Sequence, residues 1–136
     1  MASLLRKLLG IGQTPEPAPL KGRRPVRRLK MYTAMSGYVY EYVYEGYRDH
    51  DGGREHVFNV SGDRKTWFML SVSIPFRAIE EWERAQARTL NEAERYAVAK
   101  LALFAAFDER ESPAALREPV DVDEARVAAL LESIDL

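Results

Sequence analysis

The chain has 136 residues, of which 46% are hydrophobic and 30% charged, values that suit one domain with a substantial hydrophobic core. It contains no cysteine, which excludes disulfides, thiolate catalysis and cysteine-bound zinc. The net charge of −1 hides two opposite parts: residues 1–30 hold eight Lys or Arg and one Glu, a net of +7, whereas residues 31–136 hold twelve basic and twenty acidic residues, a net of −8. The sequence therefore predicts a basic arm attached to an acidic domain.

Residues 1–30 are predicted to form a flexible arm with three parts. The first is a short amphipathic helix with Leu4, Leu5 and Leu8 on one side, which would act as a tether. The second, residues 13–20, has proline at every second position from Pro15 and is typical of a semi-rigid spacer. The third is a run of cations expected to bind a polyanion or a protein partner: Lys21, Arg23, Arg24, Arg27, Arg28 and Lys30.

A period of two begins after Met31 and predicts the first strand of a single α+β domain over residues 31–136. Four tyrosines share one face of this strand, and Glu41 and Glu45 lie on the opposite face, which we expect to be exposed because carboxylates resist burial. The tyrosines have two interpretations. They would form an exposed aromatic platform, or they would pack under a helix with their hydroxyls at its rim: Tyr38, Tyr40, Tyr42 and Tyr44.

Two more strands are expected, over residues 55–61 and 66–74, with a turn at residues 49–53 before the first of them. Short connections favour antiparallel pairing. The last strand has its core face at Phe68, Leu70, Val72 and Ile74, while Trp67 and Met69 point the other way. Since only one face of this three-stranded antiparallel sheet is covered by helices, the other face predicts contact with a second copy, a homodimer.

Helices follow the third strand. Pro75 suits the first turn of a helix over residues 74–87. A second helix is predicted from Thr89 to Asp108, with a capping box formed by Thr89 and Glu92. A short C-terminal helix is expected to be capped by Asp121. The apolar face of the long helix is assigned to Leu90, Ala93, Ala97, Leu101 and Phe104, with a second apolar arc at Tyr96, Leu103 and Phe107.

No nucleophile elbow, P-loop or dinucleotide-binding motif is present, so an enzyme is not the expected class and no cofactor or metal is assigned. One polar cluster around the first hairpin offers a weaker alternative. His50 and His56, with neighbouring carboxylates, would form a metal-binding or catalytic site, although their spacing matches no established metal pattern.

The sequence therefore predicts a non-enzymatic interaction or adaptor module whose basic amphipathic arm attaches it to an acidic protein partner or an anionic membrane surface. The alternative is a small nucleic-acid-binding protein that uses the Arg-rich run and exposed tyrosines. No apolar run approaches the roughly 20 residues that span a bilayer, so we expect a cytoplasmic protein, with peripheral membrane attachment as the variant.

Overall fold

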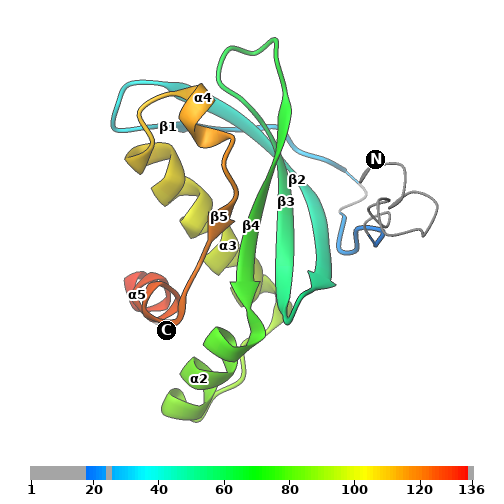
Figure 1. Cartoon of the computed structure of the whole chain (residues 1–136), viewed down its shortest axis with the longest axis vertical. Helices are drawn as coiled ribbons and strands as arrows, with labels where there is room; N and C mark the ends of the chain where they lie inside the picture. The colour runs from blue at the N-terminus through cyan, green and yellow to red at the C-terminus, as the bar shows by residue number, and fades with distance from the viewer. Residues whose placement is uncertain (1–17, 24–25, 135–136) are drawn as a thin grey trace, which may run out of the picture.

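The computed structural model describes residues 18–23 and 26–134, which form an α+β fold (Figure 1). A curled sheet has helix α3 lying along one face, with α2 at one end of the sheet and α5 packed against α2. The elements follow the order β1 (Lys30–Thr33), β2 (Val39–His50), β3 (Gly53–Ser61), β4 (Phe68–Pro75), α2 (Phe76–Gln86), α3 (Glu92–Glu109), α4 (Pro113–Leu116), β5 (Val120–Asp121) and α5 (Glu124–Ser133). In the described residues no helix is long and apolar enough to cross a bilayer.

The sheet has five strands in the order β1-β2-β3-β4-β5, so the prediction of three purely antiparallel strands is wrong in its detail. The four strands β1 to β4 pair antiparallel with their neighbours, and β5 pairs parallel with β4. Strand β1 has only four residues and begins at the last cation of the basic run. Strand β5 has two residues, too few to show any periodicity.

The hairpin between β2 and β3 turns more tightly than predicted. Strand β2 continues to His50 and β3 begins at Gly53, which leaves Asp51 and Gly52 as the turn. Both have positive φ, 51° and 72°, as a two-residue hairpin of the Asp-Gly type requires. The predicted turn was longer because the polar residues Asp49 and His50 resemble turn residues, yet they pair with Arg54 and Gly53.

Helix α3 begins two residues later than its predicted capping box. The N-cap is Asn91, whose side chain accepts a hydrogen bond of 2.8 Å from the Glu94 amide. The Glu94 carboxylate in turn accepts one of 3.0 Å from the Asn91 amide, which completes the capping box. The Thr89–Glu92 assignment was wrong because a second pair with the same spacing follows two residues on. The C-terminal helix shows the same displacement, since Asp123 and not Asp121 caps α5.

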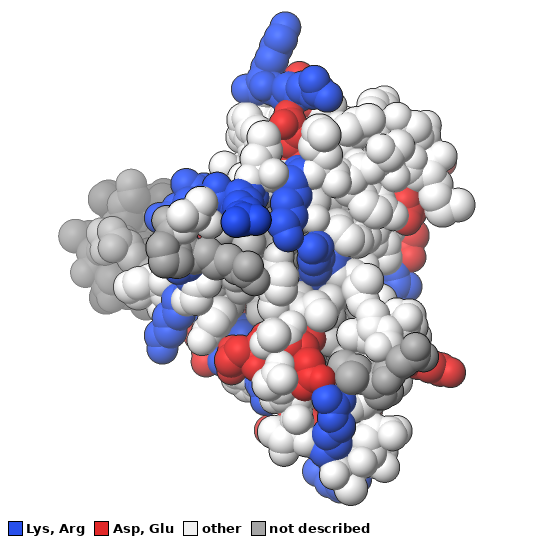
Figure 2. Space-filling view, turned by 180° about the vertical axis from the view of Figure 1, so that it is seen from behind, with Lys and Arg blue, Asp and Glu red and all other residues white. Residues whose placement is uncertain are grey.

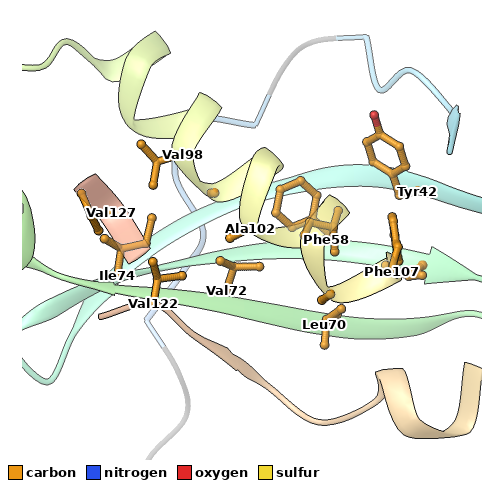
Figure 3. Close-up of a cluster of buried hydrophobic side chains, with 14 of the residues drawn as sticks. Tyr42, Phe58, Leu70, Val72, Ile74, Val98, Ala102, Phe107, Val122 and Val127 are labelled. Carbon is orange, nitrogen blue, oxygen red and sulfur yellow. The ribbon is translucent and has the colours of Figure 1, made fainter. Parts of the chain in front are cut away.

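The core lies between the sheet and α3 (Figure 3). Leu70, Val72 and Ile74 are buried, which confirms the predicted core face of β4. The apolar faces predicted for the long helix are confirmed in part, since Leu90, Leu103 and Phe107 are buried. Ala93 is exposed and Ala97, Leu101 and Phe104 are half-buried. The other buried positions were not predicted: Val98, Ala99, Ala102 and Ala106.

Candidate functional site

The described part of the basic arm lies along the edge of β2. Lys21 forms an isolated antiparallel bridge with Tyr47, in which the two residues exchange backbone hydrogen bonds of 2.7 and 2.8 Å. Gly46 permits this close approach, because a Cβ atom at that position would lie 2.5 Å from the Lys21 carbonyl oxygen. Its φ of 123° also favours glycine. The arm therefore continues the sheet beyond β1 on the same side of β2.

Glu45 joins the arm to the sheet. The pairing of β2 with β3 shifts register between Tyr44 and Gly46, so Glu45 is the extra residue of a β-bulge. Its side chain is 2% exposed and is bound by Arg23, at 2.6 Å, and by Arg27. The expectation that Glu45 would be exposed is wrong, because two guanidinium groups compensate the cost of burying its charge. Glu41 is also buried, 3.7 Å from Arg64.

A small cavity opens between the arm, β2 and α3. Its volume is about 50 Å³, room for a few water molecules or one small anion. The structure thus brings three of the predicted polyanion-binding cations next to two of the predicted tyrosines. The lining consists of Val26, Arg27, Arg28, Lys30, Tyr42, Tyr44 and Tyr96.

The tyrosine hydroxyls at this cavity are hydrogen-bond donors over the physiological pH range. Burial, reinforced by nearby Tyr96, raises the pKa of Tyr42 to about 12. Burial likewise raises the pKa of Tyr44 well above its ordinary value. Figure 3 shows the Tyr42 hydroxyl directed away from the apolar cluster. With no Asp or Glu among the lining residues, the chemistry of the cavity favours an anion.

A second cavity, of about 320 Å³, lies on the other side of the Tyr44–Tyr96 pair, and Gly22 of the arm forms part of its wall. His56 is buried there, with Nδ1 2.9 Å from the Tyr44 hydroxyl. Burial lowers the pKa of His56 to about 4, with Arg54 acting in the same direction. The imidazole is therefore neutral at pH 7 and is a weak base. Its environment explains a hydrogen-bonding role better than proton transfer.

Arg54 contacts two residues that line this second cavity, Tyr47 and Glu92. Its guanidinium lies 3.9 Å from the centre of the Tyr47 ring and pairs with Asp49 at 2.8 Å and with Glu92 at 2.7 Å. The pairing links the hairpin end of the sheet to the first turn of α3. One cation thus faces two carboxylates here, whereas no carboxylate lines the first cavity.

The four sequence-predicted tyrosines have different environments. Tyr40 and Tyr42 are buried, and Tyr40 stacks on Phe107 with 4.5 Å between ring centroids. Tyr44 is half-buried, and Tyr38 is the exposed member. An aromatic surface for stacking would therefore have Tyr38 as its most accessible ring. The tether residues Leu4, Leu5 and Leu8, together with Arg24, lie outside the described residues.

The two histidines occupy separate environments. His50 is exposed at the end of β2, with its Nε2 3.3 Å from Asp51, whereas His56 is buried on the side of the sheet that faces α3. In the part of the chain that the structure describes, no group of three or more His, Asp or Glu side chains is placed to hold a metal ion.

Exposed apolar side chains are concentrated in the same part of the sequence as the arm residues that line the first cavity. Six of the nine large hydrophobic residues that are exposed in the described residues fall between positions 26 and 39, with Met35 at 86% exposure. The sequence has no Asp or Glu from residue 17 to residue 40. The six are Val26, Leu29, Met31, Met35, Tyr38 and Val39. We call residues 26–39 the exposed strip. On the face of the molecule shown in Figure 2, basic side chains run from the top to the middle, and a group of acidic side chains lies below them.

Sequence reasoning missed Glu45 as a residue of the site and did not connect Tyr96 with the arm. Gly46 was the available signal for Glu45, since a glycine inside a strand often marks a bulge or a close approach of another backbone segment. Arg23 and Arg27, two cations four residues apart, gave no indication of a common partner.

Comparison with known proteins gave no match: no family model fits the chain, and no curated protein or solved structure is significantly similar to it. The function is therefore argued from the junction of the arm with β2 and α3.

Proposed function

We propose that this protein is a non-enzymatic interaction module that attaches to an anionic membrane surface through its basic arm and the exposed strip. The observation that carries the proposal is the combination, within one acid-free stretch, of exposed aliphatic side chains with cations that have no carboxylate partner in the described residues, Arg28 and Lys30. A lipid interface accommodates both kinds of group, since headgroup phosphates take the cations and the acyl boundary takes the aliphatic chains.

Magnitudes support weak and reversible attachment. Each Lys or Arg near an anionic leaflet contributes about 1 kcal/mol, and buried apolar area contributes about 25 cal/mol per Å². Arg23 and Arg27 contribute less than their charge suggests, because both are already paired with Glu45. Stable attachment would then need further contacts, which Leu4, Leu5 and Leu8 are suited to provide.

The test is co-sedimentation of the full chain with phosphatidylserine and phosphatidylcholine vesicles at low and moderate salt. We expect binding to the anionic vesicles that weakens with salt. It should fall in each of the single variants Arg28→Ala, Lys30→Ala, Leu29→Ser and Met35→Ser. Lys65→Ala is the matched charge control, since Lys65 is exposed in the turn between β3 and β4. Met69→Ser is the matched apolar control, since Met69 is exposed on β4.

Point variants are preferable to deletion of residues 1–30. Deletion would leave the buried Glu45 without both of its arginines and would remove the Lys21–Tyr47 bridge, so loss of binding and loss of structure would be confused. A polyglutamate peptide and a single-stranded oligonucleotide complete the test. Equal binding to neutral and anionic vesicles, or preference for either of these polymers, would contradict membrane attachment and favour an acidic protein or a nucleic acid as the partner.

A further inference from the structure

We infer that the cavity between the arm, β2 and α3 binds the phosphate of a phosphomonoester, either a lipid headgroup or a soluble compound. A role of this phosphate site in membrane attachment rests on the proposed function. Phosphate binding itself is independent of the proposed function, because it is argued from the donors and charges that line the cavity.

The charges suit a doubly charged anion. Arg27 is paired with Glu45, so its charge is largely compensated. Arg28 and Lys30 line the cavity and have no carboxylate partner among the residues that the structure describes. A phosphomonoester carries a charge between about −1.5 and −2 at pH 7, which two such cations neutralise.

The donors suit tetrahedral oxygens. Arginine presents a planar fork that binds two phosphate oxygens, and lysine acts as a compact point charge. Tyr42 adds a neutral hydroxyl donor from the opposite wall, whereas the Tyr44 hydroxyl is already engaged with His56 Nδ1. A carboxylate offers only two oxygens, so it would leave part of this donor set unused. The volume of about 50 Å³ limits the bound group to roughly the size of one phosphate.

The walls are held in place before any ligand arrives. On the arm side, Arg27 is fixed by the buried Glu45. On the domain side, the Tyr44 and Tyr96 rings meet edge to face with 4.7 Å between centroids. These contacts fix the shape of the cavity before binding, whereas the exposed side chains of Arg28 and Lys30 become ordered when phosphate binds.

The first test uses soluble probes on the full chain. The protein is titrated with inorganic phosphate and glycerol phosphate, and with sulfate and acetate at equal ionic strength, while backbone amides are followed by NMR. We expect phosphate to shift the amides of Arg28, Lys30 and Tyr42 more than acetate does. Arg28→Ala and Lys30→Ala should each weaken phosphate binding about tenfold, as loss of a charged hydrogen bond does.

Two further variants separate a specific site from general attraction. Tyr42→Phe retains the ring and removes the hydroxyl, so it should weaken phosphate binding without unfolding the protein. Lys65→Ala removes the same charge outside the cavity and should leave binding unchanged. The inference is overturned if phosphate shifts no amide of the lining residues, or if Lys65→Ala weakens binding as much as Arg28→Ala.

The second test distinguishes the source of the phosphate. Vesicles containing phosphatidic acid, a phosphomonoester, are compared with phosphatidylserine vesicles of matched surface charge. Preference for phosphatidic acid that is lost in Arg28→Ala supports a lipid ligand. Soluble phosphate binding without that preference supports a soluble phosphomonoester. If the protein binds both kinds of vesicle equally and does not bind phosphate, membrane attachment is retained and the phosphate inference is overturned. If it binds phosphate but no vesicle, phosphate binding is retained and membrane attachment is overturned.

Discussion

Arg23 donates a hydrogen bond of 2.6 Å to Glu45, and the two partners differ greatly in burial: the arginine side chain is 55% exposed and the glutamate side chain 2%. Removal of either partner therefore has unequal consequences. Loss of the carboxylate leaves two solvated cations, whereas loss of the cations leaves a buried charge without compensation.

The first prediction follows from this inequality. The double variant Arg23→Ala/Arg27→Ala should lower the free energy of unfolding by about 3 kcal/mol, because a buried carboxylate loses both partners. Glu45→Gln keeps the shape of the side chain and should cost about 1 kcal/mol. Urea unfolding measures both. A larger loss for Glu45→Gln than for the double variant would contradict the assigned burial.

The second prediction concerns the approach of the arm to β2. Gly46→Ala adds a Cβ atom 2.5 Å from the Lys21 carbonyl oxygen at a φ of 123°. We expect a loss of about 3 kcal/mol and faster amide exchange at Lys21 and Tyr47, as backbone strain is relieved by release of the arm. Gly37→Ala is the control, since Gly37 has a φ of 95° but open space around its Cβ position. It should cost only the backbone strain, about 1 kcal/mol. Similar exchange at Lys21 in both variants would show that Gly46 does not hold the arm.

The third prediction is a pH dependence that arises from His56. Its pKa is about 4 in the folded protein and about 6.5 in an unfolded chain, so the unfolded state binds the proton more readily between these values. Stability is therefore fully present above pH 6.5 and falls as the pH is lowered toward 4, by about 3 kcal/mol.

Urea unfolding between pH 7 and pH 5 isolates the histidine, because the carboxylates titrate mainly below this range. His56→Gln retains a polar group beside Tyr44 but does not titrate, so its stability should change little over the same interval. His50→Gln, at an exposed position, is the matched control and should keep the slope of the unmodified protein. A slope that persists in His56→Gln would assign the pH dependence to other groups.

The fourth prediction tests the start of α3. Asn91→Ala removes the side chain that accepts from the Glu94 amide and should lower stability by about 1 kcal/mol. Thr89 is exposed and has no side-chain hydrogen bond in the described residues, so Thr89→Ala should have little effect. Thermal unfolding of the two variants measures both changes in stability. A larger loss in Thr89→Ala than in Asn91→Ala would contradict the Asn91–Glu94 capping box.

Local patterns in the sequence were sufficient for the α+β class and for the inward face of β4. The alternation from Phe68 to Ile74 predicted the buried residues of that strand, because a strand half-buried in a sheet must alternate. The first residues of the helices were predicted less accurately. Thr89–Glu92 and Asn91–Glu94 satisfy the same spacing rule, so spacing does not select between them, and the structure has Asn91–Glu94.

The site depended on contacts between distant residues. Composition identified the cations, but it did not show that Arg23 and Arg27 turn inward to Glu45 while Arg28 and Lys30 line a cavity. Burial of Glu45 contradicts the usual preference of carboxylates, and it is favourable only because the arm returns to β2. Met69 on β4 and Trp67 just before it are exposed, and a homodimer across this face stays a prediction.

The outer edges of β2 and β4 are each paired in part by segments from outside the β2–β4 stretch of the chain. Lys21 lies against β2, and the two-residue strand β5 lies against β4, with Val120 paired to Val72. Strands β2, β3 and β4 can form from local hairpins, but β4 keeps an open edge until α2, α3 and α4 have been made and β5 arrives. During synthesis, that edge can pair with another chain. Until β5 arrives, the β4 edge is thus a place where the partly made protein can aggregate, and in the completed fold β5 pairs with two of its residues, Val72 and Ser73.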